Sequence, residues 1–289
     1  MTDGTCVPPM KFKETHYIGY DGTRMFMASW IPDNERPRAL LIAIHGLGSH
    51  GLDLATVGEY FAENGIAVFA PDMRGFGHFD GLKGHVMRFD EYVEDIQNIV
   101  MQVKDRFLNK LTYLYGISLG GMKVLRYVVA YPTTVDGILL HCPAVFQTLD
   151  INPATRFIAN ILSILNVKRF YDIPTDYEES TRSPEVIRRQ DEDPLRVDQV
   201  TPRFGIEALK ASEHSFTLGP RVVLPVLIQQ AGADKQVSPE KVKEFFDTIT
   251  SADKEFRLYE GLYHELPEEP EKDQVLGEMN AWLEKRLPS

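Results

Sequence analysis

Short, continuous apolar runs alternate with amphipathic segments along most of the chain. Continuous runs of this length are typical of strands that are buried on both faces of a sheet. The predicted strands are Ala39–His45, Ala67–Pro71, Leu111–Tyr115, Gly137–His141, Val222–Gln229 and the shorter, more polar Glu255–Tyr259. The predicted helices are Asp53–Asn64, Asp90–Phe107, Leu119–Tyr131, Pro239–Ile249 and Asp273–Leu287. This alternation predicts the doubly wound α/β class, a mostly parallel sheet with helices on both faces.

The N-terminal part of the chain has a different pattern. The segments Thr15–Gly19 and Met25–Ile31 flank Asp21-Gly22, a pair that is typical of a tight hairpin turn. We therefore expect an antiparallel hairpin before the parallel sheet.

Residues 147–218 interrupt the alternation of strands and helices. This segment has no buried-strand run, and its polar and helical pieces are separated by Pro153, Pro174, Pro184, Pro194 and Pro202. A loop of that length without any structure is improbable in a compact domain. The pattern therefore predicts a core formed by residues 1–146 and 219–289, with residues 147–218 inserted as a helical subdomain.

Composition limits the classes of partner and compartment. The 289 residues suit one large domain, or one domain with an insertion. Asp and Glu number 42 against 31 Lys and Arg, and a net charge of −11 argues against nucleic acid as a partner. Cys6 and Cys142 do not make a disulfide framework. The N-terminus lacks the apolar region of a secretory signal, and no apolar run would span a membrane. We expect a soluble, cytoplasmic protein.

The strongest local motif is Gly116-Ile117-Ser118-Leu119-Gly120. It closes a predicted buried strand and opens a predicted helix, which is the context of a nucleophile elbow with Ser118 at its apex. The turn is tight, so the positions around the serine must be small, and glycine meets that need. The alternative interpretation is an ordinary glycine-rich turn with a serine cap.

A serine hydroxyl needs a base, and in this architecture an acid and then a histidine follow it in the chain. His141 lies inside a predicted strand and His214 inside the insertion, whereas His264 follows the last predicted strand. Asp234 is the first acidic residue after the preceding predicted strand, Val222–Gln229. We predict that His264 is the base and that Asp234 orients its ring, although Asp234 would otherwise serve as a helix cap.

The oxyanion of an acyl-transfer intermediate needs backbone N–H donors. The segment His45-Gly46-Leu47-Gly48 follows the first buried parallel run. We predict that the amides of Leu47 and Leu119 are the two donors, and that His45 stabilises the loop without taking part in catalysis. The alternative is that the glycines only permit a turn.

With these residues in place, the chain resembles the α/β-hydrolase superfamily, and within it the monoacylglycerol lipase and lysophospholipase-like branch that is grouped with serine aminopeptidases. The matching segments are HGLGSH at 45–50, PDMRGFGHFDG at 71–81, FDEYVEDI at 89–96, YGISLGG at 115–121, GADKQVSP at 232–239 and YEGLYHELPEEPEKDQVLGEMNAWL at 259–283. The resemblance implies a helical cap at 147–218, a triad of Ser118, Asp234 and His264, and oxyanion donors at Leu47 and Leu119. The chain departs from the branch at Phe76, Phe79, Ile117 and Val237, where other residues are usual.

One segment of the predicted cap is unusually apolar. Residues 156–167 have a helical pattern in which Arg156, Asn160, Ser163 and Asn166 form one narrow polar stripe. Such a helix is normally buried within its own protein. In a cap over an ester site it would instead line an acyl tunnel or contact a lipid surface. For the acyl role we predict that Phe157, Ile161 and Leu165, spaced on one face, contact the substrate chain.

These features together predict a serine carboxylic-ester hydrolase. The expected substrates are small acyl esters such as monoacylglycerols or similar mono-acyl lipids, cleaved through an acyl-enzyme intermediate. The chemistry requires no metal and no organic cofactor. Two alternatives keep the same fold: a thioesterase or aminopeptidase that uses the same triad, and a binding protein without catalysis.

Overall fold

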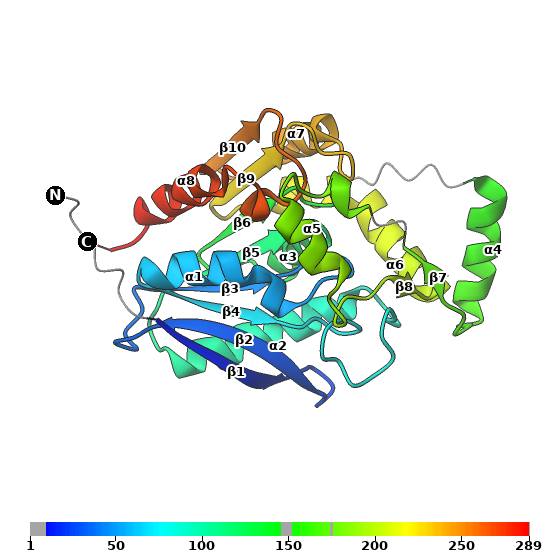
Figure 1. The fold of residues 1–289 in the computed structure, drawn as a ribbon, viewed down its shortest axis with the longest axis horizontal. Coiled ribbons are helices and arrows are strands. Elements are labelled where there is room, and N and C mark those ends of the chain that lie inside the picture. Colours follow the sequence, from blue (N-terminus) through cyan, green and yellow to red (C-terminus); the bar gives the residue numbers. More distant parts are fainter. Residues whose placement is uncertain (1–9, 146–151, 174–175, 289) are drawn as a thin grey trace.

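The computed structural model describes residues 10–145, 152–173 and 176–288. Its centre is an eight-stranded sheet in the order β1-β2-β4-β3-β5-β6-β9-β10, in which β2 runs antiparallel to both of its neighbours and the remaining pairs are parallel (Figure 1). The strands are β1 Met10–Ile18, β2 Arg24–Pro32, β3 Ala39–Ile44, β4 Ile66–Pro71, β5 Thr112–Ile117, β6 Gly137–His141, β9 Val226–Ala231 and β10 Lys254–Tyr259. The α/β class and the N-terminal hairpin that the sequence predicts are confirmed.

Helices cover both faces of the sheet. The core helices are α1 Ala55–Glu63, α2 Asp90–Arg106, α3 Leu119–Ala130, α7 Pro239–Thr248 and α8 Lys272–Glu284. Successive side chains of a strand point to opposite faces. In β3, Leu40 and Ile42 accordingly join one apolar cluster with α2, α3 and α7, while Leu41 joins the other with α1 and α8. Both faces of the central strands are therefore core.

One strand lies further along the chain than the sequence predicts. The apolar run Val222–Gln229 was expected to form a strand over its whole length, but β9 begins at Val226 and extends to Ala231. Pro225 has no backbone N–H and cannot donate to the ladder, so pairing with β6 and β10 starts at the next residue. The shift places the end of β9 closer to Asp234.

The segment expected as an insertion is built mostly of helices. Its elements are α4 Pro153–Ile164, β7 Tyr171–Asp172, the 3₁₀ turn η2 Tyr177–Glu179, α5 Pro184–Asp191, β8 Gln199–Val200, α6 Pro202–Glu213 and the 3₁₀ turn η3 Ser215–Thr217. The short strands β7 and β8 pair antiparallel. The predicted start of the insertion, at residue 147, lies outside the described residues. The two-domain division stays a prediction.

Helix α4 presents its apolar side to solvent, so the expectation that it is buried within the protein is wrong. Arg156 makes a bidentate ion pair with Glu213 of α6, and Arg203 of α6 donates to the carbonyl of Ser163. The polar stripe therefore faces α6. The exposed side chains are Phe157, Ile158, Ile161, Ile164 and Leu165, between 42% and 77% accessible.

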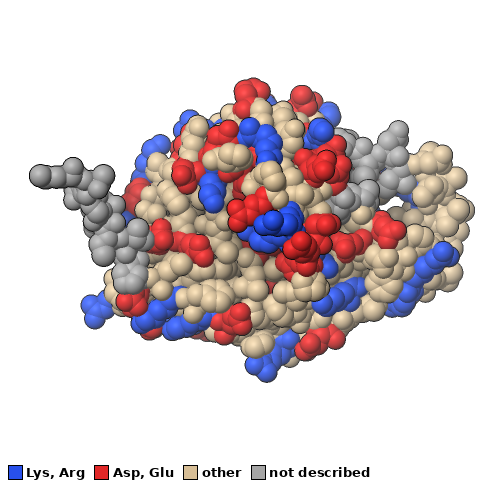
Figure 2. Space-filling model, viewed as in Figure 1, with Lys and Arg blue, Asp and Glu red and all other residues tan. Residues whose placement is uncertain are grey.

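The position of α4 agrees with this polarity. Figure 1 shows the helix at one end of the molecule, beyond α6 and away from the sheet. In Figure 2 this end is largely free of charge, with basic side chains along its border. Among the described residues, no helix is long and apolar enough to cross a membrane.

A fully buried lysine lies on α3, five residues after the elbow serine. The Lys123 ammonium is 4.5 Å from the ring centre of Tyr92 and 5.4 Å from that of Phe76, and it has no hydrogen-bond partner among the described residues. Burial lowers the pKa of Lys123 to about 7. The unfolded chain therefore binds this proton more tightly than the folded chain does, and the difference is a cost to stability at neutral and acid pH.

We expect Lys123→Met to stabilise the protein by an amount on the order of 3 kcal/mol at pH 6, after the loss of the cation–π contacts is deducted. Above pH 10.5 the lysine is neutral in both the folded and the unfolded chain. The gain in stability from Lys123→Met should therefore shrink steadily as the pH rises from 7 towards 10.5. Urea unfolding of both proteins across this pH range measures the difference. A methionine variant that is less stable at pH 6, or equally stabilised at every pH, would contradict the assignment.

Candidate active site

Ser118 lies on a strained turn between β5 and α3. Its backbone has φ +54° and ψ −123°, a region that residues other than glycine rarely adopt. The turn is possible because its neighbours are glycines: a Cβ on Gly120 would lie 2.1 Å from the Ile44 carbonyl oxygen, and one on Gly116 would lie 2.7 Å from the Gly120 backbone. The side chain of Ser118 is only half-buried. This geometry is that of a nucleophile elbow.

His264 and Asp234 meet beside this turn, each on a loop that follows a strand. The Nδ1 of His264 donates to Oδ2 of Asp234 at 2.7 Å. The other oxygen of Asp234 accepts the backbone N–H groups of Gln236 and Val237, both at 2.9 Å. Ser238 caps α7, so Asp234 is not used as the helix cap. The structure thus brings together the acid and the base that the sequence predicts.

Asp234 and His264 each shift the pKa of the other. Burial raises the pKa of Asp234, but the His264 ring and the backbone donors outweigh burial and hold the pKa below its ordinary value. Burial lowers the pKa of His264, yet the Asp234 carboxylate outweighs it and the net pKa is raised. Nε2 of His264 is buried and has no hydrogen-bond partner among the described residues. It is free to accept a proton.

A cavity of about 360 Å³ lies at this site. Ser118, His264, Leu47 and Leu119 all line it. Apolar lining comes from both core and insertion and includes Leu54, Val57, Ile117, Ala144, Ile173 and Val237. The half-buried Ser118 is therefore surrounded in the cavity by both apolar and polar side chains.

The loop between β3 and η1 Gly51–Leu54 forms the cavity wall next to the serine. His45 is buried, donates from Nδ1 to the Gly46 carbonyl at 2.8 Å and accepts at Nε2 from the Met73 amide at 2.9 Å. These contacts agree with the loop-stabilising role expected for His45. A Cβ on Gly46 would lie 3.3 Å from Cβ of Ser118, a tighter contact than is usual, so glycine eases this close approach.

The three cap residues predicted to bind the acyl chain are not among the residues that line this cavity. Phe157, Ile161 and Leu165 lie on the exposed side of α4 and at its end. Their predicted contact with the substrate stays a prediction.

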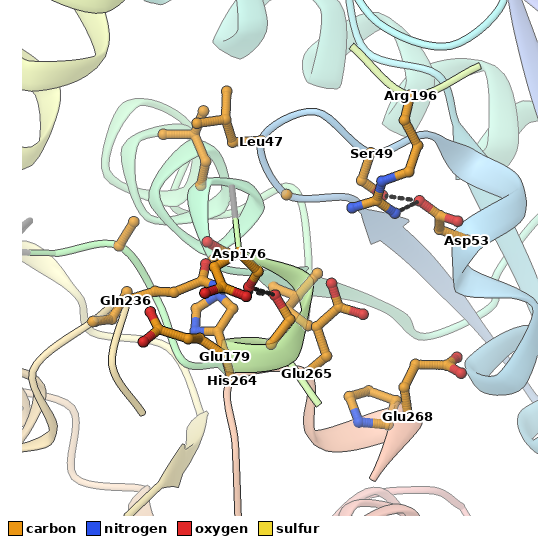
Figure 3. A pocket seen from close by; sticks show the side chains of 18 of the residues that line it. Leu47, Ser49, Asp53, Asp176, Glu179, Arg196, Gln236, His264, Glu265 and Glu268 are labelled. Carbon is orange, nitrogen blue, oxygen red and sulfur yellow. Dashed lines mark hydrogen bonds and ion pairs between the residues drawn. The ribbon is translucent and has the colours of Figure 1, made fainter. Parts of the chain in front are cut away.

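The structure adds a polar cluster that the sequence does not point to. Asp53 accepts hydrogen bonds from Arg196 at 2.6 Å and from Ser49 at 2.7 Å, and this group lies across the cavity from His264 (Figure 3). Glu265 accepts from Gln190 at 2.6 Å, and burial raises its pKa. Arg196 and Gln190 come from the insertion, about 140 residues after Asp53, and no local motif marks them.

We expect the acid limb of kcat/KM to have its midpoint above 6.5, the ordinary pKa of histidine, because Asp234 raises the pKa of His264. Only neutral His264 can accept a proton, so activity is lost as the pH falls through this raised value. Asp234→Asn removes the carboxylate and keeps the burial, so the midpoint of its residual activity should move to lower pH. A midpoint below 6.5, or one that Asp234→Asn leaves in place, would contradict this assignment.

Comparison with known proteins agrees with this geometry. The family model described as serine aminopeptidase, S33, matches residues 35–271. Phospholipase YtpA of Bacillus subtilis is 28% identical over 89% of this chain and 100% of its own length. A monoacylglycerol lipase of Mycolicibacterium smegmatis is 27% identical over 95% of this chain and 98% of its own. These relatives indicate a carboxylic-ester hydrolase.

The fold is shared with solved structures. A soluble variant of monoglyceride lipase from Saccharomyces cerevisiae, in complex with a substrate analogue, superposes with a TM-score of 0.82 and 20% identity, and the match covers 100% of this chain and 99% of that one. The family model matches residues 35–271, which is most of the sequence. This chain therefore belongs to the serine aminopeptidase S33 family of α/β-hydrolases.

Proposed function

We propose that this protein hydrolyses the carboxylic esters of mono-acyl lipids, such as monoacylglycerols, through an acyl-enzyme intermediate. One observation carries the proposal: His264, bound to Asp234, lines the same cavity as the half-buried Ser118 and keeps its Nε2 free. A mono-acyl lipid has an apolar chain and a polar alcohol, and the cavity offers both kinds of surface.

The reaction uses each residue in turn. Ser118 Oγ attacks the ester carbonyl carbon while His264 Nε2 takes the hydroxyl proton. The amides of Leu47 and Leu119 stabilise the negative oxygen of the tetrahedral intermediate. His264 then gives the proton to the leaving alcohol, and a water molecule repeats the sequence on the acyl-enzyme to release the acid. Asp234 stays ionised and holds the ring in the productive tautomer.

A second candidate keeps this triad and changes the bond that is cleaved. The matching family model is described as a serine aminopeptidase, which favours tests with an amide, and a thioester has the same carbonyl geometry. The third interpretation, a binding protein without catalysis, predicts that a fluorophosphonate probe leaves Ser118 unmodified.

A substrate panel tests the proposal. Rates are measured on p-nitrophenyl esters from C2 to C16, on monoacylglycerols, on an acyl thioester and on an aminoacyl anilide, after fluorophosphonate labelling has established an active serine. We expect labelling and the highest kcat/KM on monoacylglycerols. Faster cleavage of the anilide or the thioester would replace the ester assignment, and no labelling would refute catalysis altogether.

For the insertion we propose the role of a cap, with α4 as its lipid-facing element. The polar stripe of α4 binds α6, and its apolar side chains are left exposed beside a basic border (Figure 2). An exposed apolar helix face with basic neighbours is suited to transient contact with a lipid surface. The cytoplasmic location stays a prediction.

We expect Ile161→Ser or Leu165→Ser to lower kcat/KM for C8–C12 esters and to spare C2 esters. Each buried CH₂ of a substrate chain contributes about 0.8 kcal/mol, so only long chains lose binding when the apolar face is removed. The matched control is Leu258→Ser, because Leu258 is exposed to a similar degree on β10. Equal losses for both chain lengths, or no loss, would show that this face does not select the acyl chain.

A further inference from the structure

The structure places a buried thiol behind the catalytic acid. Cys142 directly follows β6, is fully buried, and has a positive φ of 41° that directs the chain around this corner. Its Sγ accepts the Ala231 amide at 3.4 Å, and the thiol is hydrogen-bonded to the Asp234 side chain. The Cys142 thiol therefore lies against the carboxylate that orients His264.

Cys142, Asp234 and His264 together offer the ligand atoms of a metal site. One sulfur, one carboxylate oxygen and one imidazole nitrogen lie within 4.8 Å of one another, and all three residues are buried. Tetrahedral zinc, with bonds of roughly 2.0–2.3 Å, has ligand atoms about 3.3–3.8 Å apart. Nδ1 of His264 and Oδ2 of Asp234 are 2.7 Å apart in their hydrogen bond, so the cation would replace the shared proton and these two atoms would move apart by less than about 1 Å. Thiolate, imidazole and carboxylate are also the ligand types that zinc takes in proteins.

We propose that a thiophilic divalent cation, zinc or cadmium, binds between Cys142, Asp234 and His264 and thereby inhibits the enzyme. The inhibitory part of this inference rests on the proposed function, whereas the binding part does not. The site has a defined chemistry: one thiolate sulfur, one carboxylate oxygen and Nδ1 of one imidazole.

The proton balance explains why binding would inhibit. The thiol releases its proton to solvent when the sulfur binds the cation. The cation takes the place of the proton on Nδ1, so the neutral ring carries its one proton on Nε2. A protonated Nε2 cannot accept the proton of Ser118, and the base is lost although its ring stays neutral. Because binding releases the thiol proton, binding should strengthen as the pH rises.

A second cluster provides the competing explanation. His50, Asp53 and Asp193 also lie within 4.8 Å of one another, and His50 is 2.8 Å from Asp193. This cluster already contains a cation, because the Arg196 guanidinium binds Asp53 at 2.6 Å with both side chains nearly buried. It has no sulfur, so it is less suited to a thiophilic ion.

The test measures cadmium binding and inhibition separately. The chain has two cysteines, so Cys6→Ala leaves Cys142 as its one thiol. In Cys6→Ala combined with Ser118→Ala, we expect Cd²⁺ to produce the ultraviolet charge-transfer band of a cadmium–thiolate bond, with one ion per chain. This measurement needs no activity, so it stands even if the substrate assignment fails.

Inhibition is measured as the Zn²⁺ or Cd²⁺ concentration that halves the rate, with each variant normalised to its own metal-free rate. We expect Cys142→Ala to raise this concentration at least tenfold and Cys6→Ala to leave it unchanged. Absence of the charge-transfer band in the Cys6→Ala background would overturn the proposal, even if Cys142→Ala fails to fold. Inhibition that survives Cys142→Ala and is lost in Asp193→Asn would assign the ion to the other cluster.

Discussion

Replacement of Ser118 by alanine is expected to reduce turnover by a factor on the order of 10⁴–10⁶ and to leave the fold intact. In the proposed mechanism the Ser118 hydroxyl forms the acyl-enzyme, and alanine offers no group that could replace it. The backbone strain at this position, φ +54°, is tolerated by alanine about as well as by serine. The loss of activity should therefore occur without a loss of stability.

Two measurements check this expectation. Steady-state rates on a monoacylglycerol give the loss, and thermal unfolding shows whether the variant is folded. Fluorophosphonate labelling should disappear in parallel with turnover. If Ser118→Ala kept a tenth of the wild-type activity with unchanged thermal stability, another residue would be the nucleophile.

His264→Ala is expected to cause a loss of similar size, because nucleophile and base act as a unit. His264 is buried, so part of its effect could come from lost packing, and the Asp234 carboxylate would be left without its main partner. The comparison must therefore include the stability of the variant. Rates and unfolding curves measured on the same preparations separate the two effects.

The other two histidines after the elbow are the controls. His214→Ala should keep activity near that of the wild type, because His214 is exposed at the end of α6. His141 is buried between the Tyr115 hydroxyl and the Gln229 amide, so His141→Ala should lower stability and retain turnover well above that of His264→Ala. A nearly normal His264→Ala together with an inactive variant at either control position would refute the choice of base.

Much of the fold follows from local pattern. The strands β3, β4, β5 and β6 lie within two residues of the apolar runs that predict them, because strands buried on both faces must be continuously apolar. The error at β9 has a local cause in Pro225, which delays the start of the hydrogen-bonded strand to Val226 although the residues before it are also apolar. Hydrophobicity alone does not detect a missing N–H.

The order of the predicted catalytic residues is also visible in the sequence. Ser118, Asp234 and His264 each follow a predicted parallel strand, and the carboxyl ends of parallel strands meet at one edge of a sheet. The hydrogen bond between His264 and Asp234 could be predicted for that reason. The sequence also indicates the turn at Ser118. Gly116 and Gly120 lie where a Cβ would clash with the neighbouring backbone, so glycine is needed there.

The sequence by itself thus determined the α/β class, the turn at Ser118 and the sheet edge at which Ser118, Asp234 and His264 meet. Each of these depends on residues that are neighbours in the chain or that follow parallel strands of one sheet. The roles of nucleophile, acid and base stay predictions. Only the tertiary structure decided which side of α4 faces the protein, because the partner of Arg156 is Glu213, far along the chain. The same holds for Arg196 with Asp53 and for Cys142 with Asp234. The periodicity of the sequence shows that α4 has a polar and an apolar face. It does not show which face contacts the protein, because the carboxylate that pairs with the polar face comes from a distant segment.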